Sequence, residues 1–484
     1  MAENSRVTST VYHSVDQFKF PGDTAYGWRS TLGTVRWSQA VSRRMSFNLT
    51  VLQSEYRFHL DGLAHTSEFV YASTVRQREA RLDWLWSPKP TVRVGWSGAL
   101  LGYRLSPGTI GPSADSSNIR VQTLALEQAR EGAAYLSGEW TVRPWLSVQA
   151  GLRYAGFGNI GPGRTYRYVE GVPRSEETIL DTLSYGKGQP LAKYGGWEPR
   201  LSLRIGAGPT GSVKLSYART RQFLHLISNT TAISPVDFYK VSNALVPLQV
   251  ADQWAVGYFC NFKNNVYELV LEAYMKNLSN LVEYKNGATL LLNSYLDADL
   301  LKAQGRAYGV EASLQKTRGT LTGLIAYIYA RTLVRVETPF AREQVNQGEW
   351  YAALTDRPHN LTLSTQWKWS RGWTFGTNFT YTSGRPATYP DGTYVLGGNS
   401  VLNYSRRNAN RLPEYHRLDV SFSKDTRRQA SQTRYSTVVV AFYNVYARQN
   451  PYSIYVQRYF ANTRAYQLSV YGSLIPLVSW TYTF

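Results

Sequence analysis

The residue patterns that most often signal cofactor binding are few in this chain. The glycines of residues 206–211, Gly-Ala-Gly-Pro-Thr-Gly, match the G-x-G-x-x-G spacing of a dinucleotide-binding loop. Such a loop requires a helix directly after the glycines, because the helix N-terminus binds the pyrophosphate. Here Pro209 interrupts the run, and an alternating polar and apolar segment follows at residues 212–217. We therefore interpret the glycines as a hairpin turn between two strands.

Metal ligation and nucleophilic catalysis have no support in the sequence. The six histidines form no H-x-x-x-H or H-E-x-x-H pair, and the single cysteine, Cys260, excludes an internal disulfide and a multi-cysteine metal site. The G-x-S-x-G pattern of a nucleophile elbow is also missing. We predict no catalytic residue, no metal site and no cofactor, and a protein that is not an enzyme.

The charge balance is strongly basic. The chain has 53 Lys and Arg against 33 Asp and Glu, a net charge of +20. These residues are spread along the whole chain without a basic block or a nucleic-acid-binding signature, so nucleic acid is not the predicted partner. We expect the basic residues in lumen walls, turns and the lipid headgroup zone.

Alternation with a period of two is the main structural signal. Leu146, Val148 and Leu152 alternate with Ser147 and Arg153, and about eighteen segments of the chain repeat this pattern. Aromatic residues make up 14% of the chain, yet no apolar run approaches the ~18 residues of a membrane helix. A large soluble all-β protein shares some of these features. Strands with one face in lipid and one in water explain them all, so we predict an all-β transmembrane antiparallel barrel.

The lengths of the connections support a barrel, because short and long links alternate along the chain. A β-sandwich shows no such asymmetry, whereas outer-membrane barrels have short periplasmic turns and long extracellular loops. The short links lie near residues 41–45, 87–90, 142–145, 207–211, 263–265, 316–320 and 369–373, and the long ones are residues 157–196, 221–249, 286–305, 336–356 and 384–411.

Some segments allow more than one interpretation. Residues 124–136 have a helix-forming composition, but we predict a strand there, and we expect a helical turn within residues 296–304. Glu268, Glu272 and Lys276 are predicted to face the lumen, either as a polar channel wall or as an internal salt-bridge ladder. No linker or repeat divides the chain, so we treat residues 1–484 as one barrel domain.

The chain ends on an aromatic row. Trp480, Tyr482 and Phe484 share one face of a predicted strand with Val478, and Phe484 is the last residue. Because aromatic girdles lie at both membrane interfaces of such barrels, we predict that these three rings form a barrel-insertion signal.

Two loop regions are candidates for ligand contact through ring stacking and charge. Long loops of this kind are more often solvated covers, and the ligand itself is unknown from sequence. The candidate residues are Arg164, Tyr166, Arg167, Tyr168, Trp350 and Tyr351.

Several stretches are specific enough to indicate a family. These stretches are residues 151–154, 221–230, 305–311, 415–421, 442–452 and 467–484. They resemble the strands of TonB-dependent outer-membrane receptors, in the SusC-related branch that carries a carboxypeptidase-regulatory-like extension, and the likeness covers nearly the whole chain.

This resemblance implies a location in the Gram-negative outer membrane and uptake of a nutrient such as a siderophore, glycan or peptide. Family members have a signal peptide, a plug domain, a TonB box and a barrel of twenty-two strands. With about eighteen strands, this chain is expected to be an N-terminally incomplete barrel with no plug and no TonB box. The implied partners are outer-membrane lipid and lipopolysaccharide, the TonB complex through the missing N-terminal region, and a surface lipoprotein.

Two other functions remain open at this point. A plugless diffusion porin predicts constitutive conductance, and a surface-binding adhesion barrel predicts target binding without transport.

Overall fold

The computed structural model describes residues 4–19, 24–62, 68–228, 238–370, 372–404, 406–427, 433–459, 462–469 and 472–484. Within these ranges one sheet joins twenty strands. Two of them, β6 (Gln122–Thr123) and β19 (Tyr351–Ala352), have two residues each. The other eighteen are β1 (Ser5–Lys19), β2 (Thr24–Ser42), β3 (Met45–Gly62), β4 (Phe69–Lys89), β5 (Val92–Pro112), β7 (Glu127–Arg143), β8 (Leu146–Ile160), β11 (Pro190–Ala207), β12 (Gly211–Gln222), β15 (Gln249–Phe262), β16 (Tyr267–Tyr284), β17 (Leu300–Lys316), β18 (Leu321–Val336), β20 (His359–Lys368), β21 (Trp373–Thr382), β26 (Tyr415–Asp425), β27 (Tyr435–Tyr443) and β30 (Ile475–Thr483).

Short elements occupy the connections between the long strands. Five two-stranded hairpins or bridges and a few helical turns lie there, and none of the helices in the described ranges has the length and apolar composition that a membrane crossing needs. These elements are β9 (Gly163–Tyr168), η3 (Glu176–Thr178), β10 (Ile179–Tyr185), β13 (Leu224–Ile227), β14 (Phe238–Val241), α1 (Leu296–Asp299), η4 (Ala341–Glu343), η5 (Val345–Gly348), β22 (Pro386–Ala387), β23 (Gly392–Leu396), β24 (Asn399–Asn403), β25 (Asn410–Arg411), β28 (Pro451–Tyr459) and β29 (Asn462–Ser469).

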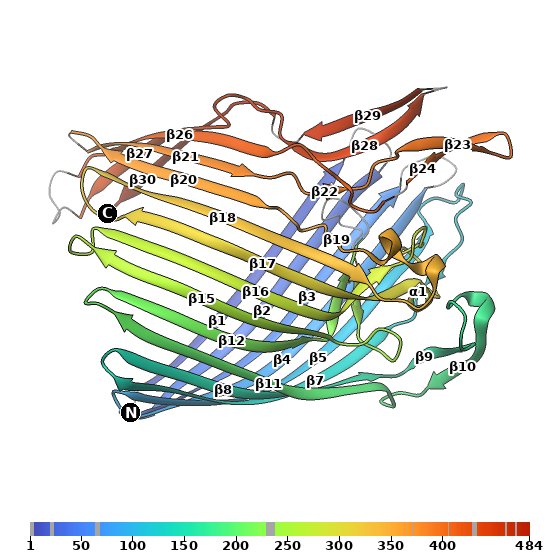
Figure 1. Cartoon of the computed structure of the whole chain (residues 1–484), viewed down its shortest axis with the longest axis horizontal. Coiled ribbons are helices and arrows are strands. Elements are labelled where there is room, and N and C mark those ends of the chain that lie inside the picture. Colours follow the sequence, from blue (N-terminus) through green and yellow to red (C-terminus); the bar gives the residue numbers. More distant parts are fainter. Residues whose placement is uncertain are drawn as a thin grey trace.

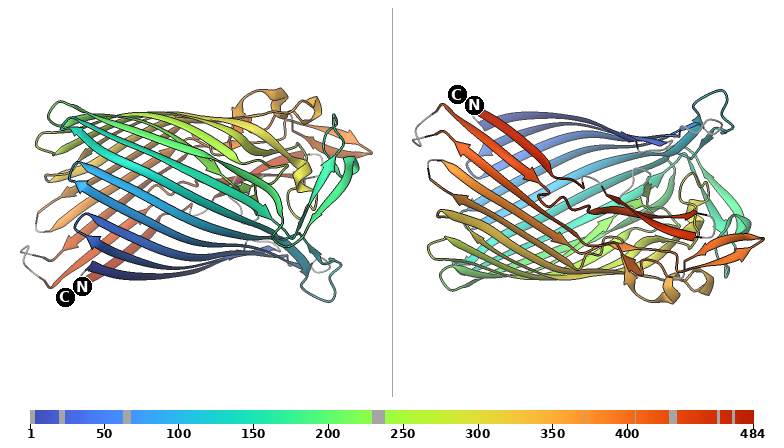
Figure 2. Two further views of the ribbon diagram at one scale, coloured as in Figure 1. Left: turned by 90° about the horizontal axis from the view of Figure 1, so that it is seen from below. Right: turned by 90° about the horizontal axis from the view of Figure 1, so that it is seen from above.

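The long strands form an up-and-down meander. Each pairs antiparallel with the next long strand in the chain, from β1–β2 to β27–β30. The sheet curls into a barrel, with short turns and both chain ends at one rim and long loops at the other (Figure 1, Figure 2). The prediction of about eighteen antiparallel strands with short turns and long loops is confirmed.

The seam between the two terminal strands of the sheet, β1 and β30, is unpaired among the described residues. Among the described residues, β1 is paired only with β2, and β30 only with β27. The two views of Figure 2 superimpose the N- and C-terminal ends because they look along the same axis, whereas Figure 1 shows these ends well apart along the turn rim. Each strand therefore presents one backbone edge at this seam, and in hydrocarbon an unpaired backbone group costs several kcal/mol.

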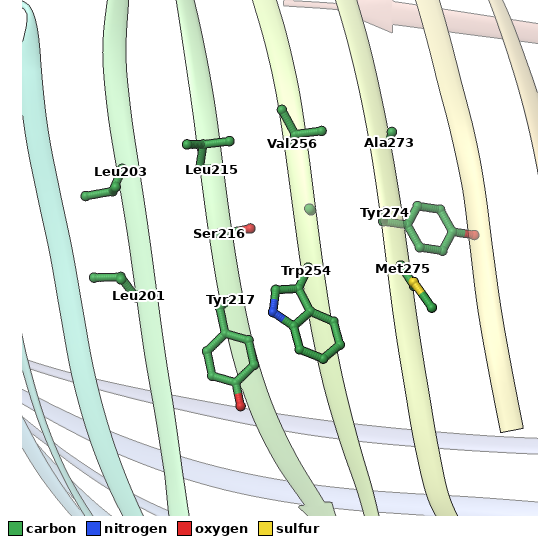
Figure 3. A pocket seen from close by; sticks show the side chains of 11 residues that line it. Leu201, Leu203, Leu215, Ser216, Tyr217, Trp254, Val256, Ala273, Tyr274 and Met275 are labelled. Atoms are coloured by element: carbon green, nitrogen blue, oxygen red, sulfur yellow. The ribbon is translucent and has the colours of Figure 1, made fainter. Parts of the chain in front are cut away.

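The two faces of the wall have opposite chemistry. On one face apolar side chains stay exposed, as Leu201, Leu215 and Val256 do at 41–45%. These side chains surround a shallow apolar depression of about 550 Å³ across β11, β12, β15 and β16 (Figure 3). The opposite face carries the ion pair between Arg153 and Glu198. The apolar face is the one that lipid covers, and the polar face lines the lumen.

The glycine motif is a turn, as predicted. β11 ends at Ala207 and β12 begins at Gly211, and the two strands are paired in register up to that point. Gly208 has φ +75°, a left-handed conformation that glycine adopts without a steric penalty. No helix follows, so this segment cannot hold a pyrophosphate as a dinucleotide loop does.

The ambiguous segments are now resolved. Residues 127–136 of the helix-like stretch belong to strand β7, as predicted. The expected helical turn is confined to α1, because Leu300 already begins β17. None of the ion pairs found in the described ranges involves Glu268, Glu272 or Lys276. These side chains lie opposite the exposed Leu271 and Met275 on β16, which favours the polar wall over the salt-bridge ladder.

Trp480 and Tyr482 of the C-terminal aromatic row lie on β30, and Phe484 directly follows the last residue of that strand. Trp480, Tyr482 and Phe484 are 69%, 50% and 90% exposed, and successive ring centroids are 6.3–6.5 Å apart. Val440 and Phe422 share that face of the sheet through the pairing of β26, β27 and β30. The role of the row as an insertion signal stays a prediction.

The assignment of the two faces predicts an asymmetric response to charge. Leu215→Arg should destabilise the barrel in lipid vesicles by about 2–4 kcal/mol, because it places a cation in the hydrocarbon. Ser216→Arg, one residue further along β12 and on the lumen face, should cost less than about 1 kcal/mol. Urea unfolding in vesicles measures both, and equal losses for the two variants would contradict the assignment.

Candidate functional site

The connection between β12 and β15 folds into the barrel. Its strands β13 and β14 pair as a hairpin, and β14 lies against β5 and β7. The ring of Phe223 stacks on Phe157 of β8 with 4.7 Å between centroids. Phe157 is on the same face of β8 as the lumen-facing Arg153, so the hairpin packs against the inner wall.

An apolar patch on the lumen face holds this hairpin. Alternation makes this face polar elsewhere, but near the loop rim it carries buried apolar side chains from β5, β7 and β8. Burying one large apolar side chain contributes about 1.5–3 kcal/mol, so the contact is strong enough to keep the hairpin inside. The wall contributes Leu105, Ala129, Ala155 and Phe157, and the connection contributes Phe223, Val241 and Leu248.

A buried lysine ties the hairpin to two other elements. Lys240 of β14 is 6% exposed, and its Nζ lies 2.7 Å from Glu127 Oε1 on β7 and 2.7 Å from Asp297 Oδ1 on α1. Burial by itself lowers the pKa of Lys240, but the two carboxylates raise it above its ordinary value. Asn243 also donates to Asp297 Oδ2 at 2.8 Å. The charged lysine therefore joins wall, hairpin and loop helix.

A second polar contact closes the base of the hairpin. The Nε2 of His225 lies 2.8 Å from Ser242 Oγ, and both residues are fully buried. Asn159 of the wall donates to the Ser242 carbonyl at 3.2 Å. Burial, and then the charge of Lys240, lower the pKa of His225 to about 4. The histidine is therefore neutral at physiological pH.

The loop between β16 and β17 crosses the mouth of the barrel. Leu291 and Leu292 pack on a buried cluster of Phe58 and Tyr71, which belong to β3 and β4. Gln122 Nε2 also donates to the Leu292 carbonyl at 2.9 Å. Because β3 and β16 lie eight strands apart along the eighteen-stranded wall, this loop spans the opening from one side to the other.

Arginines fasten the remaining loops at the same rim. Arg407 donates to Glu283 Oε2 at 3.0 Å and to the Tyr284 carbonyl at 2.9 Å, and its guanidinium lies over the Tyr284 ring. Asp356 is fully buried and accepts from both Arg331 and Arg411. The loop rim is thus a network of paired charges rather than a set of independent loops.

A cavity of about 670 Å³ lies within this network. Of the residues predicted to contact ligand, Arg164 and Tyr166 line it, and the Tyr166 ring is 5.4 Å from that of Tyr295. Arg167 is exposed beside them on β9, whereas Tyr168 is buried. Burial and the nearby Asp297 carboxylate raise the pKa of Tyr168 to about 12. The further lining residues that sequence reasoning missed include Asn159, Tyr185, Tyr239, Lys240, Asn293 and Asp297.

The other two predicted residues lie elsewhere and do not line this cavity. The Trp350 ring packs under the guanidinium groups of Arg306 and Arg335, 4.5 and 5.1 Å from its centroid. Arg306 shares its face of β17 with the exposed Val310, so Trp350 covers the outer side of the barrel. Tyr351 is 6% exposed within an apolar cluster. The structure thus separates these two residues from Arg164 and Tyr166.

A second cavity, of about 770 Å³, lies further down the lumen. Arg153 at its wall donates to both oxygens of Glu198 at 2.9 and 3.0 Å, and to Glu131 at 3.0 Å. Tyr103 donates to Glu131 at 3.3 Å. Arg81, Asp83 and Arg200 also line the cavity. This pairing gives the inner wall fixed charges of both signs, with no catalytic arrangement among them.

The described architecture is that of an outer-membrane β-barrel, and comparison with known proteins identifies the family. The family model described as TonB dependent receptor-like, beta-barrel, matches residues 3–445. The chain therefore belongs to the TonB-dependent receptor family and forms the barrel of an outer-membrane transport receptor. Proteins of this family work with TonB in nutrient uptake and are transporters, not enzymes. No curated protein sequence matches the chain.

Solved structures show the same fold at low sequence identity. BauA, the ferric preacinetobactin receptor from Acinetobacter baumannii, is 13% identical with a TM-score of 0.62, covering 100% of this chain and 70% of that one. The ferric citrate transporter FecA is 11% identical with a TM-score of 0.64, covering 99% and 68%. The ferric yersiniabactin uptake receptor FyuA from Yersinia pestis is 12% identical with a TM-score of 0.62, covering 96% and 62%.

The lysine contact predicts a specific loss of order. Lys240→Met leaves Glu127 and Asp297 without their partner, so the free energy of opening the hairpin should fall by about 3–5 kcal/mol. Hydrogen exchange of residues 238–248 measures this opening. Lys276→Met, which removes a lumen-facing lysine that has no ion pair in the described ranges, should leave the exchange unchanged. Equal protection in wild type and Lys240→Met would contradict the role of the contact.

The histidine predicts a pH dependence of the same hairpin. Since the pKa of His225 is about 4 in the closed hairpin and about 6.5 when exposed, the closed form is favoured fully above pH 6.5. Its stability should decrease as the pH falls from about 6.5 to about 4, because opening then takes up a proton. Exchange of residues 238–248, corrected for intrinsic rates, should show this change in wild type but not in His225→Gln.

Proposed function

We propose that the mouth cavity is the ligand-capture site of this receptor. The observation that carries the proposal is the lining itself, which combines a cation, aromatic rings and amides in a cavity closed by loops from several strands. Lys240 is paired there with two carboxylates, Glu127 and Asp297, so it offers no free positive charge. Arg164 has no carboxylate partner in the described ranges and is exposed to the cavity. Its charge is therefore available to a ligand.

An anionic metal chelate fits this lining best. A guanidinium forms paired hydrogen bonds to carboxylate groups, and Tyr166 beside it offers a ring for stacking. The structures that share this fold include receptors for ferric preacinetobactin and ferric yersiniabactin and a ferric citrate transporter. These neighbours support a ferric siderophore over a glycan or a peptide, which the sequence left open.

The loop network also bears on the porin alternative. The hairpin inside the wall and the loop across the mouth both narrow the path through the lumen. We propose that transport requires release of these contacts together with a plug region and a TonB-contacting segment, added to the barrel of residues 1–484. A surface lipoprotein that binds the loop rim remains part of this proposal.

Ligand binding by Arg164 can be tested directly. Arg164→Gln should weaken binding of a ferric siderophore or ferric citrate by at least about tenfold, because a charge-assisted hydrogen bond is lost. Arg318→Gln, in a turn at the opposite rim, is the matched control and should bind as wild type does. Isothermal titration of the purified barrel with ferric chelates, a neutral oligosaccharide and a peptide measures both.

The same purified barrel also distinguishes a ferric chelate from other ligands, and a receptor from a diffusion porin. Binding of the oligosaccharide or the peptide in preference to every chelate would contradict the proposed ligand class. Steady conductance of the wild-type barrel in planar bilayers would favour the diffusion porin instead.

A further inference from the structure

The outer surface carries an arginine band that the transport function does not use. On β2, β3, β4, β5 and β7, arginines follow the exposed apolar residues towards the loop rim and share their outward face. On β3, for example, Arg57 has the same orientation as the exposed Val51. All members of this arginine band are exposed, and they are Arg29, Arg57, Arg76, Arg78, Arg104 and Arg130.

The strand register sets members of the band directly against each other. Arg29 is the cross-strand partner of Arg57, and Arg76 is the cross-strand partner of Arg104. Like charges in directly opposite positions destabilise a sheet. Two such pairs on adjacent strands therefore require a compensating anion to be favourable.

The protein supplies too little negative charge for this purpose. Glu55 is the carboxylate in contact with the band, at 3.3 Å from Arg57 and 2.6 Å from Arg76. Arg29, Arg104 and Arg130 have no carboxylate partner among the described residues. Elsewhere on the outer wall, by contrast, Arg219 is paired with Asp252 at 2.7 Å. The band therefore keeps positive charge that no carboxylate in the described ranges balances.

The position of the arginine band along the membrane normal indicates where the anion comes from. On β2 the outward residues run from the exposed Val41 through Trp37 and Val35 to Arg29. Those twelve positions span about 28 Å along the membrane normal for a strand tilted by about 45°. This distance matches the apolar band of such barrels, so Arg29 lies where the lipid headgroups begin.

We propose that the arginine band binds the phosphate groups of lipid headgroups in the outer leaflet. Guanidinium groups form paired hydrogen bonds with phosphate oxygens, and apposed arginines on neighbouring strands present several donors to one phosphate. A phosphate between Arg76 and Arg104, or between Arg29 and Arg57, converts repulsion into attraction. Because the band faces outward, a ligand inside the lumen does not reach it.

Binding of a phosphorylated lipid tests the proposal. The purified chain in neutral detergent is titrated with lipid A, and bound lipid is measured by native mass spectrometry. Arg29→Gln/Arg104→Gln should weaken lipid A binding by about 30-fold, since each arginine near a charged surface contributes about fivefold. Glu55→Gln should strengthen it by about fivefold, because the competing carboxylate is gone.

A matched control removes an apposed cationic pair from the other face. Arg204 and Lys214 are direct cross-strand partners on the lumen side of β11 and β12, so Arg204→Gln/Lys214→Gln deletes the same charge without touching the band. This variant should bind lipid A as wild type does. In lipid-free neutral detergent, Arg29→Gln/Arg104→Gln should melt at or above the wild-type temperature, because repulsion is relieved.

Three results would overturn the proposal. The first is wild-type lipid A binding by Arg29→Gln/Arg104→Gln, and the second is an equal loss in the lumen control. The third is displacement of the lipid by inorganic phosphate at matched concentration, which would assign the band to a free anion instead of a headgroup.

Discussion

Backbone hydrogen bonding in hydrocarbon is the constraint on which this structure depends. Lipid offers no partner to an N–H or C=O group, so every spanning strand must be paired on both sides. The meander from β1 to β30 satisfies this requirement at each step between neighbouring long strands. The seam between β1 and β30 is where the described pairing stops. Closure there needs a partner for both edges, whether each other or a further segment.

With the strands paired, side chains alternate between the lipid face and the lumen face. Positions that depart from this alternation mark the functional region. The lumen face is polar except near the loop rim, where Leu105 and Phe157 interrupt the pattern. Those apolar positions receive the hairpin between β12 and β15, and Lys240 then locks the hairpin to the wall and to α1. The mouth of the barrel is therefore organised by one apolar patch and a few buried charges.

The positions of the basic residues also differ between the two faces of the barrel wall. Inside the barrel, Arg153 is matched by Glu131 and Glu198, because an unpaired charge at a partly dry wall is costly. On the outer face above the apolar belt, Arg29 and Arg104 are left unmatched. A surface that meets anionic headgroups tolerates such an excess, whereas a surface that meets water or hydrocarbon has no counter-charge to offer.

The amino-acid sequence by itself determined the strands, their number, the long and short connections and the turn at residues 206–211. Those features depend on neighbours within a few residues, through the period of two and the conformational freedom of glycine. It also pointed to Arg164 and Tyr166. Only the tertiary structure decided that residues 223–228 and 238–248 enter the lumen, that Tyr351 is buried and that Trp350 faces outward. These outcomes depend on contacts such as that of Lys240 with Glu127, between residues more than a hundred positions apart. The pattern of residues within one strand or loop does not predict which distant residues will be in contact.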